Sequence, residues 1–161
     1  MVKARGLRES LAERRRQLDA FRQVPLSERR ERLAEARAQA LDLRSRRVLE
    51  FDSESDFDRD ALDDWLLSAY FFDRYNYWAF VHTDDSTQAF EKALTADFQG
   101  AQALFVNSDR NFLQYESEAL LALFFPDVTR RSKPLPGADA LVSIDRAREL
   151  IGFEPSVRSV I

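Results

Sequence analysis

The single histidine of the chain, His82, stands two and three residues before Asp84 and Asp85, a spacing that could serve general acid–base chemistry. An imidazole beside carboxylates can take up and release a proton near neutral pH. No recognisable motif places a serine nucleophile near it, and the chain has no cysteine. The two aspartates also fit the start of a helix, where free N–H groups need acceptors. We therefore favour helix capping for the aspartates and a structural role for His82 over catalysis.

A second set of carboxylates alternates along the sequence as the ligands of a calcium loop do. These residues are Asp52, Glu54, Asp56, Asp58 and Asp60. A calcium loop needs a glycine at its sixth position, and the two possible registers put Phe57 or Ala61 there. The pattern therefore favours a solvated acidic linker, and no metal site is expected.

The charge of the chain is unevenly distributed. Residues 1–50 hold 14 Lys and Arg against eight Asp and Glu, whereas the remainder holds 10 against 20. The basic part interleaves its charges and offers no aromatic stacking platform, which disfavours nucleic-acid binding. The longest uncharged apolar run, residues 65–72, is too short to span a bilayer, and no apolar signal core follows the first residues. We expect a soluble, cytoplasmic protein with no membrane partner.

The periodicity of apolar residues predicts an α+β fold with helix in excess. Helices are expected over residues 7–22, 27–47, 84–94, 116–125 and 144–150, and short strands over 77–82 and 101–106. Ser27 and Ser143 are the expected N-caps of two helices, and Gly152 the expected left-handed residue after the last one. The organisation that follows is a basic helical arm (1–47), an acidic and aromatic connector (48–75) and a C-terminal lobe (76–161). The aromatic residues concentrated between 65 and 80 are expected to pack in a core rather than to hold a ligand.

Four segments of the lobe carry a family resemblance. They are YWAFVHTDDSTQAFEKA (77–93), QGAQALFVN (99–107), EALLALFFPD (118–127) and LVSIDRARELIGFEP (141–155). In this order they resemble the C-terminal portion of the NAD-dependent epimerase/dehydratases, the extended short-chain dehydrogenase/reductase family. The resemblance covers residues 76–158, and SIDRARELIGFEP is its most specific part. It implies a small substrate-binding lobe that packs, in the intact family, on an N-terminal Rossmann half.

Two features of that family are absent from this sequence. The glycine-rich turn that holds the dinucleotide cannot be built, because the only glycines are Gly6, Gly100, Gly137 and Gly152. No tyrosine is followed four residues later by lysine, so the Tyr-x-x-x-Lys pair is missing as well. Although the family uses NAD or NADP, we expect this chain alone to bind neither cofactor and to have no catalytic residues of its own. Whether it acts as an enzyme in any context is left open.

The resemblance also implies a substrate site for a small, sugar-like molecule such as a nucleotide sugar. Its candidate residues are Trp78, His82, Arg131 and Lys133. Trp78 stands near the position where nucleotide-sugar members carry a phosphate-binding arginine, and the two basic residues fall in a second region that contacts substrate in the family. An ordinary solvated basic loop is the alternative for Arg131 and Lys133.

The favoured hypothesis is a truncated epimerase/dehydratase-like protein that carries the substrate lobe and is not catalytically competent alone. One alternative is a protein-interaction module that uses the N-terminal helices. Another is a lobe that complements a separate Rossmann partner. In each case exposed apolar surface is expected to be covered by the helices, by self-association or by a partner.

Overall fold

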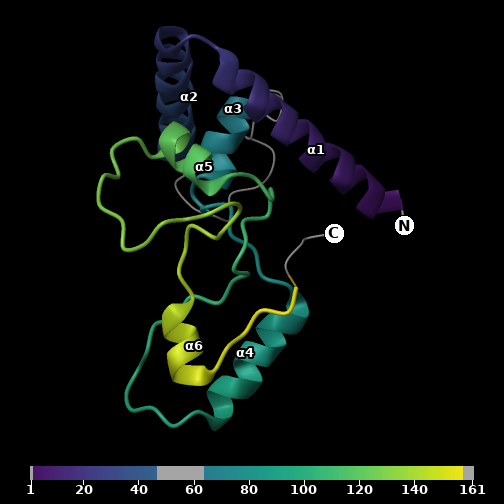
Figure 1. Ribbon diagram of the computed structural model, residues 1–161, viewed down its shortest axis with the longest axis vertical. Coiled ribbons are helices and arrows are strands. Elements are labelled where there is room, and N and C mark those ends of the chain that lie inside the picture. The colour runs from purple at the N-terminus through teal and green to yellow at the C-terminus, as the bar shows by residue number, and fades with distance from the viewer. Residues whose placement is uncertain (1, 47–63, 158–161) are drawn as a thin grey trace. The chain divides into compact units, whose positions relative to one another are not determined.

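The computed structural model describes residues 2–46 and 64–157, and it divides into two compact units, Met1–Tyr75 and Asn76–Ile161 (Figure 1). Helices are the only regular elements longer than a single bridge among the described residues. The expectation of a helix-rich fold is therefore confirmed. The acidic linker, with its alternating carboxylates at 52–60, lies outside the described residues.

The first unit is led by two long helices, α1 (Val2–Gln23) and α2 (Leu26–Arg46), which confirms the helices expected in this part of the chain. Their buried side chains form thin apolar stripes: Leu11, Leu18 and Phe21 on α1, and Ala36 and Ala40 on α2. The prediction that Ser27 is the N-cap of α2 is wrong, because the helix already begins at Leu26. The carbonyl of Pro25 accepts from the N–H of Arg29 at 2.9 Å and so starts the helix directly after the proline.

The aromatic segment of this unit folds into one turn of α-helix, α3 (Trp65–Ser68), followed by a π-helical turn, η3 (Ala69–Asp73). The Asp64 carboxylate caps α3 by accepting from the N–H of Leu66 at 2.7 Å. Tyr70 and Phe71 are buried, which agrees with core packing as the role of this aromatic cluster. A π-turn shifts the following residues around the helix axis, so neighbouring aromatic rings can reach the same interior.

Three side chains of the long helices, Phe21, Arg14 and Arg44, attach this aromatic segment to them. The rings of Phe21 and Trp65 meet edge to face at 5.5 Å. Arg14 of α1 donates to the Trp65 carbonyl at 3.0 Å and pairs with Asp73 at 3.3 Å. Arg44 of α2 donates to the Phe71 carbonyl at 2.7 Å. The basic helices thus supply the partners of the aromatic segment and form one unit with it.

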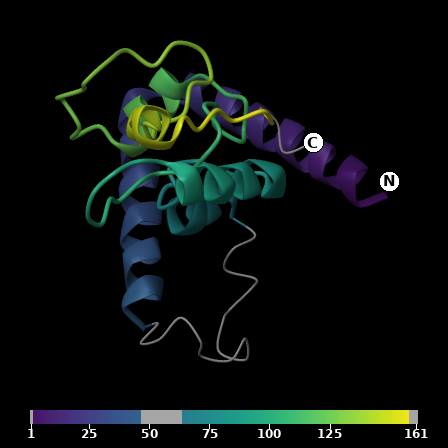
Figure 2. The same ribbon diagram turned by 90° about the horizontal axis from the view of Figure 1, so that it is seen from below.

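The second unit contains α4 (Thr83–Thr95), α5 (Ser117–Phe124) and α6 (Asp145–Ile151), joined by long irregular segments. Helices α4 and α6 lie side by side in Figures 1 and 2. The core between them consists of Ala89, Ile144, Ala147, Ile151 and Phe153. The helix expectations for 84–94, 116–125 and 144–150 are confirmed, and Gly152 ends α6 with a φ of +64° as expected.

Two predicted helix starts differ in detail from the structure. The N-cap of α4 is His82, whose Nδ1 accepts from the N–H of Asp84 at 3.3 Å, so neither aspartate is the cap. The N-cap position of α6 is Ile144, although the Ser143 hydroxyl does accept from the N–H of Asp145 at 3.1 Å. Asp85 has a different role, described below.

The predicted strands at 77–82 and 101–106 are wrong, since neither segment forms a strand in the described part of the chain. Tyr77 and Trp78 adopt φ angles of 53° and 52°, and such left-handed residues interrupt an extended run. Residues 101–106 are irregular in the structure, and a strand requires a hydrogen-bonded neighbour. The β part of the α+β expectation fails for this reason.

Candidate functional site

A cavity of about 170 Å³ opens in the second unit between α6 and the segment that precedes it. It combines three carboxylates with two cationic and four apolar side chains. Its lining residues are Asp109, Lys133, Leu135, Asp139, Ala140, Val142, Ser143, Ile144, Asp145 and Arg148. Carboxylates accept hydrogen bonds and the cationic groups donate them, so this lining can bind a ligand rich in hydroxyl groups.

A short antiparallel contact forms one wall of the cavity. The N–H of Ala140 donates to the Asp109 carbonyl at 2.8 Å, and that of Asn111 donates to the Ala138 carbonyl at 2.9 Å. An isolated bridge pairs Arg110 with Asp139 between them. This pairing brings the carboxylates of Asp109 and Asp139, distant in sequence, to the same cavity.

The side chain of Asn111 fixes this wall from behind. It is fully buried, and its amide donates to the carbonyls of Tyr115 at 2.8 Å and Ala138 at 3.2 Å and to the Ser117 hydroxyl at 3.0 Å. Its oxygen accepts from the N–H of Tyr115 at 3.2 Å. A buried amide with its hydrogen-bonding groups satisfied specifies one backbone arrangement. Asn111 therefore positions the cavity wall without lining the cavity.

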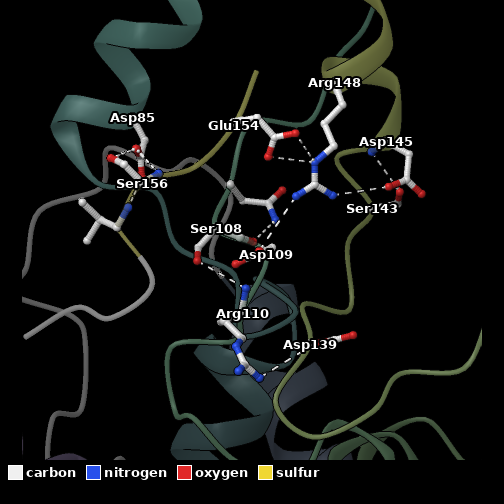
Figure 3. A network of polar contacts seen from close by, with 12 residues as sticks. Asp85, Ser108, Asp109, Arg110, Asp139, Ser143, Asp145, Arg148, Glu154 and Ser156 are labelled. Carbon is white, nitrogen blue, oxygen red and sulfur yellow. Dashed lines mark hydrogen bonds and ion pairs between the residues drawn. The ribbon is translucent and has the colours of Figure 1, made fainter. Parts of the chain in front are cut away.

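Arg148 projects from α6 toward three carboxylates (Figure 3). Its Nε donates to Glu154 at 3.1 Å, and its terminal nitrogens lie 3.7 Å from Asp145 and 3.9 Å from Asp109. The contact with Glu154 joins α6 to the segment after it. The longer contact with Asp109 orients the guanidinium at the edge of the cavity.

Lys133 enters the same site from the preceding loop. Its Nζ donates to Asp145 at 2.8 Å, and about half of each side chain stays exposed. The hydrogen bonds with Lys133 and with Ser143 hold the pKa of Asp145 below its ordinary value. The Asp145 carboxyl is thus ionised at neutral pH, and both side chains are accessible to a solute.

The structure separates the four predicted site residues. Trp78 is 1% exposed and packs on Phe124 with ring centroids 5.0 Å apart, so it lies in the core. His82 is an exposed helix cap, and its imidazole lies 3.4 Å from the Asp84 carboxylate.

Of the two predicted basic residues, only Lys133 lines the cavity. Arg131 pairs instead with Glu118 of α5, and that hydrogen bond holds the pKa of Glu118 below its ordinary value. Arg148, Asp109 and Asp139 were not anticipated as site residues. Arg148 lies inside the motif SIDRARELIGFEP, so the family resemblance could have pointed to it. Asp109 and Asp139 lie outside the quoted segments, and no motif singles them out.

A second polar cluster closes the end of the unit. Asp85, fully buried at the start of α4, accepts at Oδ1 from the N–H and hydroxyl of Ser156, and at Oδ2 from the N–H of Val157 at 3.2 Å (Figure 3). Gln88 and Glu154 exchange a further pair of hydrogen bonds beside it, at 2.9 and 3.0 Å. These contacts hold the end of the described chain along α4.

Neither a metal-binding cluster nor a membrane-spanning helix is found in the part of the chain that the structure describes. No group of three or more His, Cys, Asp or Glu side chains within 2–46 and 64–157 is arranged to hold a metal ion. None of the helices in those ranges has the length and apolar character that crossing a bilayer requires.

Comparisons of the chain with protein-family models, with curated proteins and with solved structures return no match. The resemblance to epimerase/dehydratases therefore rests on the sequence segments quoted above.

Proposed function

We propose that the second unit is the substrate lobe of an epimerase/dehydratase-like protein and binds the sugar-like part of a substrate, without catalysing its conversion alone. The observation that carries this proposal is the cavity in which Lys133 and Arg148 stand beside Asp109, Asp139 and Asp145. Paired donors and acceptors around a small hollow suit the hydroxyl groups of a sugar ring.

The small volume of the cavity supports a site that encloses only part of its ligand. Its 170 Å³ falls below the roughly 300–1,000 Å³ of pockets that enclose a drug-sized ligand. A lobe that contributes one wall of a larger cleft is expected to have such a hollow. The absence of a glycine-rich turn and of a Tyr-x-x-x-Lys pair supports the further proposal that the chain alone binds no NAD or NADP and transfers no hydride.

The surface of α4 favours a second candidate function, that of a lobe completed by a separate Rossmann partner. Ala89 and Ala93 of α4 pack toward α6, whereas Phe90 and Leu94 are 74% and 86% exposed. Of these four apolar side chains of α4, two are thus packed and two are left exposed. A Rossmann-type partner that covers this half would remove two large apolar side chains from water.

The test uses the full chain with UDP-glucose as the probe and two-dimensional NMR as the readout. We expect resonance shifts confined to the cavity residues, with a dissociation constant on the order of millimolar because only part of a ligand is enclosed. Lys133→Gln should weaken binding several-fold, since it removes one cationic donor. Arg130→Gln is the matched control, because Arg130 is exposed and lines no part of the cavity.

The catalytic part of the proposal has its own test. Adding NAD or NADH should leave the melting temperature unchanged, and no epimerase, dehydratase or dehydrogenase turnover should appear. A melting temperature raised by either nucleotide, or measurable turnover, would contradict it. Absence of any cavity shift with UDP-glucose would contradict the substrate-lobe proposal. Co-purification with a Rossmann-type protein that depends on Phe90 and Leu94 would favour the second candidate.

A further inference from the structure

The segment that joins α5 to α6 contains a stretch without regular secondary structure. Residues 129–135 (TRRSKPL), which we call the strap, form part of the open loop between these two helices in Figure 1. Residues 129–134 are all exposed, and Leu135 is half-buried. Among the described residues, no backbone–backbone hydrogen bond involves 129–135. The strap is therefore held by contacts with side chains.

Two carboxylates, one on α5 and one on α6, make these contacts. Glu118 in the first turn of α5 makes two of them: its Oε1 accepts from the N–H of Leu135 at 3.3 Å, and its Oε2 pairs with Arg131. Asp145 at the start of α6 accepts from the Nζ of Lys133 at 2.8 Å. Three alternate residues of the strap are thus attached to the two helices.

The backbone on either side of the strap is fixed by hydrogen bonds of its own. Before the strap, the N–H of Val128 donates to the Phe125 carbonyl at 3.0 Å. After it, the Gly137 carbonyl accepts from the N–H of Ser117 at 2.7 Å, and Gly137 turns the chain with a φ of +54°. The strap can therefore move between two fixed points without disturbing α5.

Both residues that the strap contributes to the cavity lining stand directly before a proline. Lys133 precedes Pro134, and Leu135 precedes Pro136. A residue before proline is restricted to extended backbone, and proline has a fixed φ of its own. Residues 133–136 therefore have few conformations available to them, so Lys133 and Leu135 should move together.

The contacts that hold the strap are weaker than those that hold the cavity wall. The four charged side chains of its two ion pairs are between 35% and 54% exposed, and water and salt weaken exposed pairs. The wall formed by residues 109–111 and 138–140 has backbone hydrogen bonds and the buried amide of Asn111 instead. Local opening is easiest where few apolar contacts are buried. The strap thus opens at a lower free-energy cost than this wall.

We propose that the strap is a movable lid of the cavity, held closed by Glu118 and Asp145. Lys133 and Leu135 line the cavity while these contacts hold, so opening withdraws both from the lining. The cavity then keeps Arg148 as its cationic side chain. A solute enters past the open strap and is bound by Lys133 once the strap closes. This motion does not depend on the identity of the solute, so it is tested apart from the substrate-lobe proposal.

The experiment uses the absence of cysteine from the chain, which allows a single nitroxide spin label to be attached through Ser132→Cys. Ser132 is exposed in the middle of the strap, so the label should report its motion without disturbing its contacts. The electron paramagnetic resonance spectrum of the labelled full chain should contain an ordered and a mobile component. Glu118→Gln and Asp145→Asn should each raise the ratio of mobile to ordered label about two- to fivefold, as expected for the loss of an exposed ion pair.

A salt titration gives a second measurement that needs no change at either carboxylate. Raising the NaCl concentration from about 10 mM to about 0.5 M screens both ion pairs, so the mobile fraction of the labelled chain should increase. The double variant with Glu118→Gln and Asp145→Asn has lost both pairs. Its mobile fraction should therefore be higher than that of either single variant and should not depend on salt.

The matched control is Glu116→Gln, which removes the same charge from the same end of α5. The Glu116 side chain is exposed and makes no capping hydrogen bond, so this change should leave the ratio unchanged. A label at Ala122→Cys, exposed on α5, should stay ordered in every variant. The proposal is overturned by a strap label that is fully mobile before any further substitution, or by a ratio that salt or either strap variant leaves unchanged. An equal response to Glu116→Gln would overturn it as well.

Discussion

The carboxylate of Asp85 accepts hydrogen bonds at 2.8 Å from the N–H and at 2.7 Å from the hydroxyl of Ser156, which lies 71 residues further along the chain. This contact joins the first turn of α4 to the end of the described chain (Figure 3). Burial favours the protonated carboxyl, but the hydrogen bonds from Ser156 and Val157 outweigh it and lower the pKa of Asp85. The acid stays ionised and acts as a fixed acceptor.

Replacing Asp85 should therefore destabilise the second unit in a pH-dependent way. Asp85→Asn loses the charge-assisted hydrogen bonds, and we expect the free energy of unfolding at pH 7 to fall by about 2 kcal/mol. Because the folded-state pKa is lowered, the wild-type advantage is present above about pH 4 and is lost as the pH falls through the folded-state pKa. Urea unfolding at pH 7 and at pH 3 measures both values. Asp84→Asn, at a side chain that is 78% exposed, should change little at either pH.

Asp73 in the first unit should show the opposite pH dependence. Burial raises its pKa to about 6, and the Arg14 guanidinium at 3.3 Å offsets only part of that rise. A raised carboxyl pKa means that the folded state binds the proton more tightly, so stability should increase as the pH falls from 7 toward 4. Asp73→Asn should remove this contribution, which amounts to at most about 3 kcal/mol.

The measurement can follow the two units separately. Trp65 lies in the first unit and Trp78 in the second, so their two indole N–H resonances report unfolding of each. The difference between wild type and Asp73→Asn should vary with pH at Trp65 and stay constant at Trp78. Glu28→Gln, at an exposed side chain of α2, serves as the control. A pH-independent difference at Trp65 would contradict the raised pKa.

Trp78 should matter for stability and not for ligand contact. Its ring packs on Phe124 and is 1% exposed, so Trp78→Ala should cost about 3–5 kcal/mol of unfolding free energy. Trp78→Phe keeps most of the apolar volume and should cost clearly less. Phe90→Ala, at a side chain that is 74% exposed, should cost under about 0.5 kcal/mol in a urea titration. A stable Trp78→Ala variant that loses only ligand binding would contradict the core assignment.

The sequence by itself determined the five longer helices and their approximate ends, but not the short helical turns α3 and η3 in the connector. Leu11 and Leu18 recur at helical spacing, and Pro25 separates α1 from α2 because proline cannot donate the next helical hydrogen bond. Gly152 follows α6 because glycine tolerates the left-handed conformation found there. These features depend only on residues close together in the chain, so they can be predicted from the local sequence.

Only the tertiary structure decided which residues form the site and whether the apolar runs become strands. Residues 101–106 have the composition of a strand, but a strand exists only where a partner supplies hydrogen bonds, and the described chain supplies none. Arg131 and Lys133 are both basic residues of the same loop, and the sequence does not distinguish their roles. In the structure, Arg131 pairs with Glu118, whereas Lys133 lines the cavity. The sequence predicts that Asp85 caps a helix, whereas in the structure its carboxylate accepts a hydrogen bond from Ser156, far along the chain. Each outcome depends on a partner many residues away, which a local pattern does not contain.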